Sequence, residues 1–167
     1  MTKVFLSRPN WIAPEFEAGH RAFEKVLRDL KIAPQTIGVT HHPQGSPMDA
    51  VIEVMDECDG AIVLGYPQLE IAAGKCKSQP IVSPLLLATE WNHIEAGLAY
   101  ARGLPLLFIH HQGVSRGVFD RGALNKFLYS ADLSIESWAL SDQIHPAIVE
   151  WKEKIDKERR SKRRKDK

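Results

Sequence analysis

The apolar residues of this chain fall into two alternating patterns. Short continuous runs of apolar and β-branched residues, bounded by Pro, Gly or Asn, are typical of buried strands. Stretches in which apolar residues recur three and four positions apart are typical of helices that pack one face on a core. The runs predict strands at residues 3–7, 36–40, 60–65, 105–110 and 135–139. The stripes predict helices at residues 14–31, from 47 to about 55, 89–102, 122–129 and from about 142 onward.

This order of elements predicts an α/β fold. Strands that alternate with helices form a parallel sheet with helices on both of its faces, a three-layer sandwich of four to five strands. We expect one domain over residues 1–155, followed by a basic tail over 156–167. The stretch from Tyr66 to about Leu87 is irregular and long, and a compact domain seldom keeps such a stretch without a functional role.

Composition and charge narrow the class of protein. The chain has 167 residues, of which 44% are hydrophobic and 26% charged, the mix of a soluble globular protein. The apolar runs are too short to cross a bilayer, and two cysteines do not make a disulfide framework. Residues 152–167 carry a net charge of +6 and the remainder −5, which is not the distribution of a nucleic-acid-binding fold. We therefore expect a cytoplasmic protein with neither a membrane nor a nucleic acid as partner.

Several common chemistries lack their motifs. The glycine-rich phosphate loops GxGxxG and GxxxxGK[ST] do not occur, and neither does the G-x-S-x-G turn of serine hydrolases. His93-Ile94-Glu95 matches the H-x-E of zinc deaminases, but their P-C-x-x-C is absent. No metal and no cofactor is expected, although NAD is a possible substrate.

The segment from Thr89 to Pro105 carries the most specific signal. Trp91 and Glu95 are four residues apart and so share a helix face, and the small residues that follow, among them Gly97 and Ala101, would let the helix pack close to the sheet. Ligands of parallel sheets bind at the carboxyl ends of the strands. Those ends are predicted at Ser7–Asn10, Thr40–His42, Tyr66 and His110–Gln112.

Glu95 is expected to face the surface near this crevice, so that Glu95→Gln would change stability little. A carboxylate there suits attack on, or stabilisation of, a cationic sugar carbon at C1′. The alternative interpretation is a structural one, in which Glu95 only interacts favourably with the dipole at the start of its helix.

The pattern Glu95-x-Gly97-x-Ala99-x-Ala101-x-Gly103-x-Pro105, followed by an apolar strand, resembles the nucleoside 2-deoxyribosyltransferase family and the related nucleotide N-glycosidases. The resemblance extends to residues 4–7, 58–63 and 115–117. It implies that Glu95 is the nucleophile that takes the sugar from the base. The family's second catalytic carboxylate is missing, because Val51 stands at its position.

The same segment resembles a second family. Trp91-x-x-x-Glu95 is similar to the W-x-x-x-E of TIR domains, in whose NAD-cleaving members that glutamate is catalytic. Both families have a flavodoxin-like layout and cleave the same type of bond. The resemblances imply a hydrolase or transferase that cleaves the N-glycosidic bond of NAD or a related nucleotide or nucleoside. The competing interpretation is a sensor of nucleotide signals without catalysis, or a TIR-like scaffold.

The candidate site residues follow from these resemblances. Glu95 is the candidate catalytic residue. The candidates for substrate binding are Ser7, Arg8 and Asn10 for ribose or phosphate, Tyr66 and Trp91 for the base, and Ser115 and Arg116 for phosphate. We expect a nucleotide-like small molecule as the ligand and a homo-oligomer as the assembly.

Overall fold

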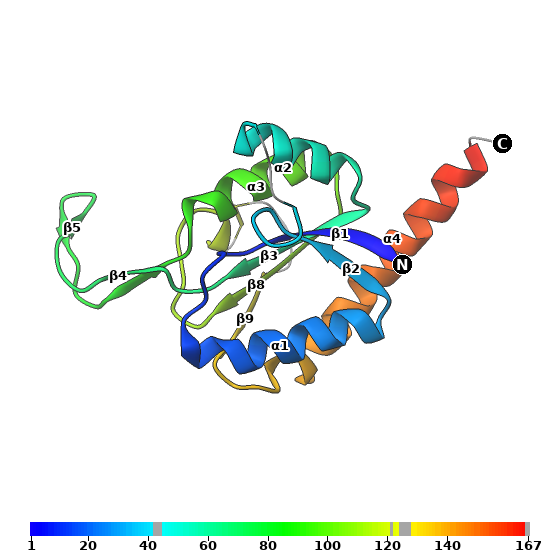
Figure 1. The fold of residues 1–167 in the computed structure, drawn as a ribbon. Coiled ribbons are helices and arrows are strands. Elements are labelled where there is room, and N and C mark those ends of the chain that lie inside the picture. Colours follow the sequence, from blue (N-terminus) through cyan, green and yellow to red (C-terminus); the bar gives the residue numbers. More distant parts are fainter. Residues whose placement is uncertain (42–44, 121, 124–127, 166–167) are drawn as a thin grey trace.

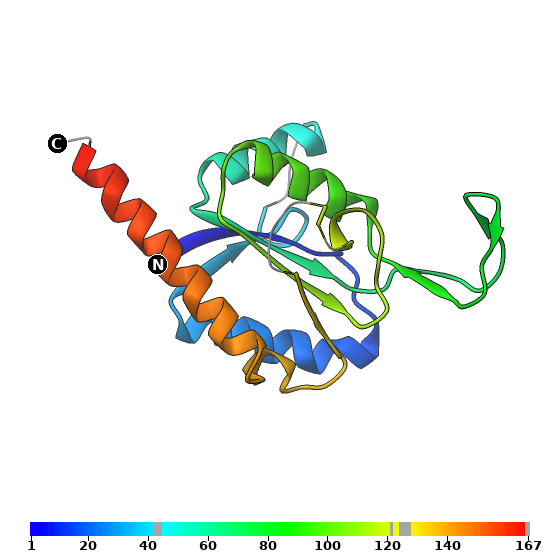
Figure 2. The same cartoon turned by 180° about the vertical axis from the view of Figure 1, so that it is seen from behind.

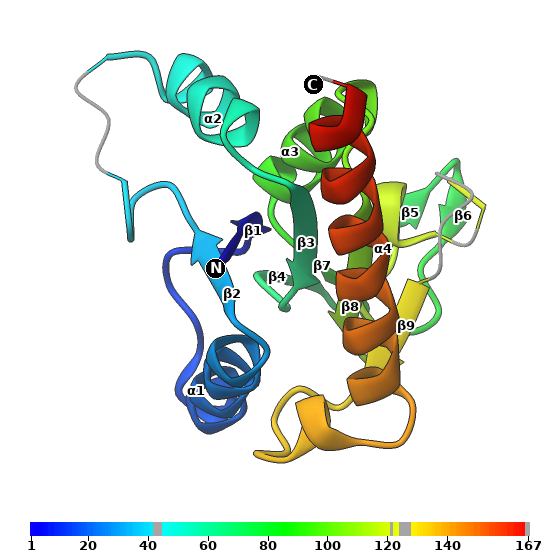
Figure 3. The ribbon, with the colours of Figure 1, turned by 90° about the vertical axis from the view of Figure 1, so that its right-hand side faces the viewer.

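The computed structural model describes residues 1–41, 45–120, 122–123 and 128–165. Five parallel strands form its central sheet, in the order β2-β1-β3-β8-β9. Figure 3 shows the strands in this order from one edge to the other. Their bounds are Ile32–Gln35, Thr2–Ser7, Gly60–Gly65, Leu106–His111 and Leu128–Ala131. This is the strand order of flavodoxin-like folds, so the predicted three-layer α/β class is confirmed.

Four helices cover the two faces of the sheet (Figure 1). They are α1 (Pro14–Asp29), α2 (Pro47–Asp56), α3 (Glu90–Ala101) and α4 (Ile144–Lys165). The helices α1 and α4 pack on one face, in a core that includes Phe23, Ile62 and Ile148. The helices α2 and α3 pack on the other face, around Phe5, Met55 and Ala96. Each strand residue therefore belongs to one core or the other according to the side of the sheet on which it projects.

Between β3 and α3 the chain forms an arm that extends away from the body (Figures 1 and 2). The predicted irregular stretch is thus wrong in part, because it holds two small antiparallel ladders. The strands of the arm are β4 (Leu69–Ile71), β5 (Lys75–Cys76), β6 (Gln79–Pro80) and β7 (Leu85–Leu87). Sequence periodicity misses strands of two or three residues, because a run this short has no measurable alternation.

The predicted second strand, residues 36–40, is wrong. The strand instead covers Ile32–Gln35 and pairs with β1, and the chain after Thr36 turns back on itself, with the His41 and Thr40 amides donating to the Thr36 carbonyl. Pro34 is tolerated inside β2 because this strand lies at the edge of the sheet, where one side makes no ladder. The predicted strand end at Thr40–His42 is therefore also wrong for the described residues 40 and 41.

The predicted fifth strand, residues 135–139, is wrong as well. The last strand is Leu128–Ala131, and residues 138–140 form the short 3-10 helix η2 (Trp138–Leu140), whose Trp138 ring stacks on Phe23 at 5.0 Å between ring centroids. The helix predicted over 122–129 is wrong at Leu128 and Tyr129, which lie in β9, and its residues 124–127 lie outside the described part. A second 3-10 helix, η1 (Gly117–Phe119), follows β8.

The C-terminal helix crosses the expected domain boundary. α4 continues through Lys165 without a break after Ile155, so the division into a domain 1–155 and a tail 156–167 stays a prediction. Arg159 lies near the start of β1, where its guanidinium donates to Thr2 Oγ1 at 3.0 Å and pairs with Asp59 at 3.2 Å. In the described residues, no helix is long and apolar enough to cross a membrane.

Candidate functional site

A cavity of about 450 Å³ opens beyond the carboxyl end of β1, and its far wall is the start of α3. The β1–α1 loop, the turn after β2, the start of α2 and Gln68 form the remaining walls. The residues that line it are Arg8, Pro9, Asn10, Trp11, Ile37, Gly38, Pro47, Val51, Gln68, Thr89, Trp91 and Glu95. The chain after β1 leads to α1 on one face of the sheet, and the chain after β3 leads to α3 on the other face. Flavodoxin-like folds bind their ligands at the point where two neighbouring strands connect to opposite faces in this way. The volume is also that of a small-molecule site.

The cap of α3 decides which of its side chains reach this cavity. Thr89 is the N-cap, and its hydroxyl oxygen accepts a hydrogen bond from the Asn92 backbone amide at 3.1 Å. The helix that begins there leaves the Trp91 side chain 42% exposed and turns Asn92 and Glu95 inward, at 0% and 8% exposed. The first turns of α3 thus supply both an aromatic side chain at the rim of the cavity and buried polar side chains beneath it.

Glu95 is buried, which corrects the expectation that it faces the surface. It takes this position because its side of α3 packs on the sheet together with Ala96 and Ala99. Gly97 and Ala101 are exposed instead, so their small size does not serve the packing that was predicted for them.

Burial controls the ionisation of Glu95. It raises the pKa of the carboxyl group to about 7, against the opposing effect of a hydrogen bond from the Ser7 side chain. Among the described residues, no cation forms an ion pair with this carboxylate. A strongly shifted carboxyl group in a cavity at the ligand-binding edge of the sheet is a candidate for catalysis.

Asn92 is a residue that sequence reasoning missed. Its amide donates a hydrogen bond to Ser7 Oγ at 2.8 Å, which links the start of α3 to the end of β1. The sequence feature that could have identified Asn92 is its position three residues before Glu95, on the same helix face. A polar side chain in an apolar setting there has to find a hydrogen-bond partner.

Trp11 was also missed. It lines the same cavity as Trp91 and is 63% exposed, although a large aromatic side chain is usually buried. Two exposed indole rings on one rim provide flat apolar surface on which a heterocyclic base can stack. The sequence feature that could have identified Trp11 is its position directly after Asn10, just beyond a predicted strand end.

Arg8 and Asn10, the candidates for contact with ribose or phosphate, also line the cavity. The Arg8 guanidinium is half-buried and donates to the Pro9 carbonyl at 2.7 Å, and burial lowers the pKa of this group. Asn10 lies against Gly38, whose φ is +77° and where a Cβ atom would come within 2.4 Å of the Asn10 amide nitrogen. Only glycine therefore allows the turn after β2 to approach the β1–α1 loop this closely.

Tyr66 does not lie in the cavity. Its ring is fully buried on the α1 side of the sheet, where its hydroxyl is 3.0 Å from His20 Nδ1 and its ring centroid 5.5 Å from that of Phe16. Side chains alternate along a strand, so Tyr66 shares the side of Leu64, whereas Val63 projects toward α3. This placement does not fit the prediction that Tyr66 encloses the base.

Ser115 and Arg116 also lie apart from the cavity. Arg116 lines a second hollow of about 280 Å³ together with Glu90, His93 and residues of the arm, and its guanidinium contacts Cys76 Sγ. The Ser115 amide donates to the Leu86 carbonyl at the base of the arm. The start of α3 separates this hollow from the one that Glu95 lines, so the structure does not bring the predicted phosphate contacts to Glu95.

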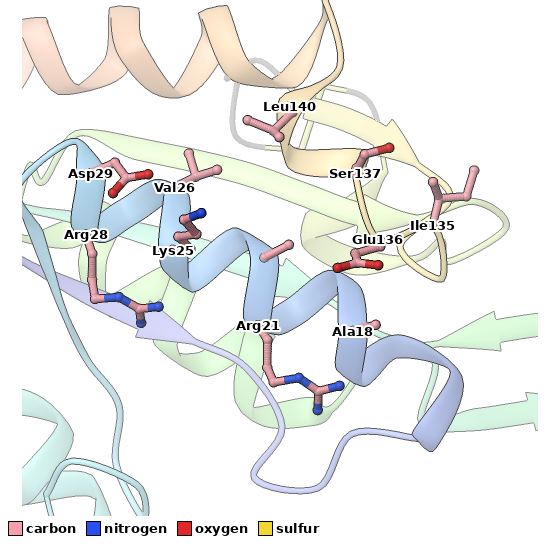
Figure 4. A pocket seen from close by; sticks show the side chains of 11 residues that line it. Ala18, Arg21, Lys25, Val26, Arg28, Asp29, Ile135, Glu136, Ser137 and Leu140 are labelled. Carbon is pink, nitrogen blue, oxygen red and sulfur yellow. The ribbon is translucent and has the colours of Figure 1, made fainter.

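A larger hollow of about 710 Å³ lies between α1 and residues 135–140 (Figure 4). Arg21 and Arg28 point away from residues 135–140, and Lys25 and Glu136 lie at the edges of the hollow. Apart from Val26 its lining is exposed or partly exposed, and it holds no buried titratable group. The larger volume therefore does not outweigh the chemistry of the Glu95 cavity.

In the described part of the chain, no three His, Cys, Asp or Glu side chains form a cluster suited to a metal ion.

Comparison with known proteins adds little to this description. No protein-family model matches the chain, and no curated protein matches it significantly. Among solved structures, the CMP N-glycosidase BcmB of Clostridium botulinum is similar over 83% of this chain and 94% of that chain, with a TM-score of 0.49 and 16% sequence identity. A similarity at this level does not carry a substrate from one protein to the other.

Proposed function

We propose that this chain cleaves the N-glycosidic bond of a nucleotide-like molecule, with Glu95 as the catalytic carboxylate and NAD as the preferred substrate. The observation that carries the proposal is the buried Glu95, which forms no ion pair with the described residues, in a cavity with two exposed indole rings at its rim. The rings suit a heterocyclic base, and Arg8 suits a phosphate group of the same molecule.

The proposed reaction breaks the bond between C1′ of the ribose and the base nitrogen, whose electron pair leaves with the base. The Glu95 carboxylate stabilises or captures the positive C1′. Water then adds to C1′ and releases a proton. With NAD, the departing electron pair neutralises the pyridinium nitrogen, so nicotinamide leaves without receiving a proton.

The absence of a second acid favours NAD over an ordinary nucleoside. Val51 lines the cavity and is 1% exposed, at the position where the resemblance to the deoxyribosyltransferases calls for a carboxylate. Glu95 is the only acidic residue among the described residues that line the cavity. A base that needs a proton to leave would lack a second donor, whereas nicotinamide needs none.

The test is incubation of the protein with NAD, nucleosides and nucleotides, followed by chromatography for free base. We expect NAD to be cleaved faster than deoxyinosine or deoxycytidine monophosphate, and Glu95→Gln to lower the rate on the order of a thousandfold. Val51→Asp should not accelerate NAD cleavage. Rapid release of base from the deoxynucleotides with NAD untouched would support a nucleotide glycosidase of the deoxyribosyltransferase type.

The missing second acid also favours one non-catalytic alternative, a sensor that binds a nucleotide and keeps it intact. In that case NAD or a nucleotide would raise the melting temperature while chromatography recovered it unchanged. Cleavage that is lost in Glu95→Gln would exclude the sensor.

A further inference from the structure

The polar side chains at the start of α3 form a directed chain of hydrogen bonds. The Thr89 hydroxyl accepts from the Asn92 backbone amide and donates to Asn92 Oδ1, at 3.1 Å and 3.2 Å. Because the Asn92 oxygen is occupied, its NH₂ group is the part that faces Ser7, and it donates to Ser7 Oγ at 2.8 Å. The N-cap of the helix thus fixes which way round the Asn92 amide lies.

The orientation of Asn92 determines what Ser7 can do. A hydroxyl that accepts a hydrogen bond from an amide keeps its own hydrogen for another acceptor. Ser7 is 1% exposed and Asn92 0%, so water does not compete for this hydrogen. The acceptor nearest in function is the Glu95 carboxyl group, which lies on the same face of α3 as Asn92 and whose pKa the Ser7 side chain lowers.

We propose that Asn92 is a positioning residue, which holds the Ser7 hydroxyl so that its hydrogen is donated to the Glu95 carboxylate. The catalytic consequence rests on the proposed function: this chain of hydrogen bonds orients the carboxylate that stabilises C1′ and opposes the effect of burial on its ionisation. Asn92 itself does not touch the substrate in this proposal.

The other charged groups around Glu95 do not take over this role. Arg8 is the other charged residue among the described residues of the cavity wall, and it forms no ion pair with Glu95. Neither β3 nor η1 carries a titratable side chain. The acidic residues of α2 are exposed, and its Asp56 is paired with Arg102 at 2.7 Å. On the remaining neighbours, His93 of α3 accepts from the Val118 amide and His110 of β8 packs on Phe119.

The direct test follows the titration of Glu95 by ¹³C NMR of its carboxyl carbon, assigned by the signal that Glu95→Gln removes. Ser7→Ala and Asn92→Ala should each move the titration above the wild-type value of about 7, because each removes the donation to the carboxylate. Asn92→Asp should move it further, since a carboxylate at position 92 accepts the Ser7 hydrogen and adds a like charge. Gln68→Ala, which alters the same cavity outside the chain of hydrogen bonds, should leave the titration unchanged.

A double variant separates a positioning role from a merely structural one. If Asn92 acts through Ser7, Ser7→Ala with Asn92→Ala should titrate like Ser7→Ala alone. The double variant also removes both buried partners together, which protects the test from an unpaired hydroxyl that destabilises the single variant. An Asn92→Ala protein that titrates like wild type, or shifts that add in the double variant, would overturn the proposal.

The dependence of the cleavage rate on pH is the second readout. The alkaline shift in Asn92→Ala should lower the rate at pH 6 by about tenfold for each unit, with recovery at high pH. A loss that is equal at every pH would contradict the positioning role. If the wild-type protein cleaves nothing, the proposed function fails, whereas the NMR titration still decides the role of Asn92.

Discussion

Glu95 is a carboxyl group that the fold buries without a cation to compensate it. Such groups lower the stability of the protein at neutral pH, because the charged form loses its hydration. The same burial leaves the carboxylate weakly hydrated, so that it interacts more strongly with positive charge in the cavity. Function and stability are thus opposed at this single position.

The first prediction concerns the stability of Glu95→Gln. The raised pKa of Glu95, about 7 against an ordinary 4.5, means that between these pH values the folded chain keeps a proton that the unfolded chain has released. The free energy of unfolding therefore falls as the pH rises through this window. Glutamine does not titrate, so we expect Glu95→Gln to be more stable than wild type by on the order of 2–3 kcal/mol at pH 8.

Urea denaturation at pH 4.5 and pH 8 provides the measurement. The advantage of the variant should nearly vanish at pH 4.5, where the carboxyl group is protonated in the folded chain. If the variant were more stable than wild type by the same amount at both pH values, the charge of Glu95 would not be the cause of the difference.

Two helical glycines provide a second prediction at the scale of the residue. A Cβ atom at Gly97 of α3 would meet nothing within 4 Å, whereas one at Gly19 of α1 would lie 2.7 Å from the Leu133 carbonyl and from the Trp138 ring. Gly97→Ala should therefore stabilise the protein by about 0.5–1 kcal/mol, the ordinary difference in helix propensity. Gly19→Ala should destabilise it by about 1–3 kcal/mol through overpacking. Thermal unfolding of the two variants measures both effects, and a destabilised Gly97→Ala would indicate a contact at that face.

The elements that sequence reasoning found are those with a long apolar pattern. The buried strand Gly60–Gly65 and the helices Pro47–Asp56 and Glu90–Ala101 lie where the apolar pattern predicts them. The two edge strands were misplaced because an edge strand of four residues needs little apolar surface. Pro34 lies within one of these strands, although Pro is expected at the ends of apolar runs.

The C-terminal helix gives a prediction at the scale of the element. In the described part of the chain, the last side-chain contacts of α4 with the body are those that Arg159 makes with Thr2 and Asp59. Deletion of Ser161–Lys167 should leave the melting temperature unchanged, because it removes none of these contacts. Arg159→Ala should lower the stability by about 0.5–1 kcal/mol, as expected for a partly exposed ion pair. Thermal unfolding distinguishes the two, and a large loss on truncation would mean that the basic end binds the body.

At the scale of the whole molecule, the candidate site depends on contacts that no single segment predicts. Glu95 and Trp91 could be paired from their spacing on one helix, but Ser7 and Asn92 are 85 residues apart in the chain. The sequence does not tell which face of a buried strand meets which helix, so it could not show that Tyr66, a candidate for enclosing the base, lies on the α1 side of the sheet. The side of the sheet on which a strand residue lies follows only from the packing of the helices on both faces.

The arm provides the prediction at this scale. Residues 72–84 contribute no side chain to either buried core. Replacement of this segment by Asn-Gly, which can join Ile71 to its partner Leu85 in a two-residue hairpin, should leave the melting temperature within about 2 °C of wild type. Differential scanning calorimetry makes the comparison. A fall of about 10 °C would mean that the arm stabilises the body through contacts of its outer half.

The position of α4 has a consequence for the growing chain on the ribosome. Ile144, Ile148, Trp151 and Ile155 complete the core on the α1 side, and they are synthesised after all five strands of the central sheet. Until they emerge, the sheet has one apolar face only half covered, with the side chains of Ile62 and Leu107 open to water or to another nascent chain. Emergence of α4, rather than synthesis of the central strands, is then the step at which the exposed sheet face is covered and the risk of aggregation falls.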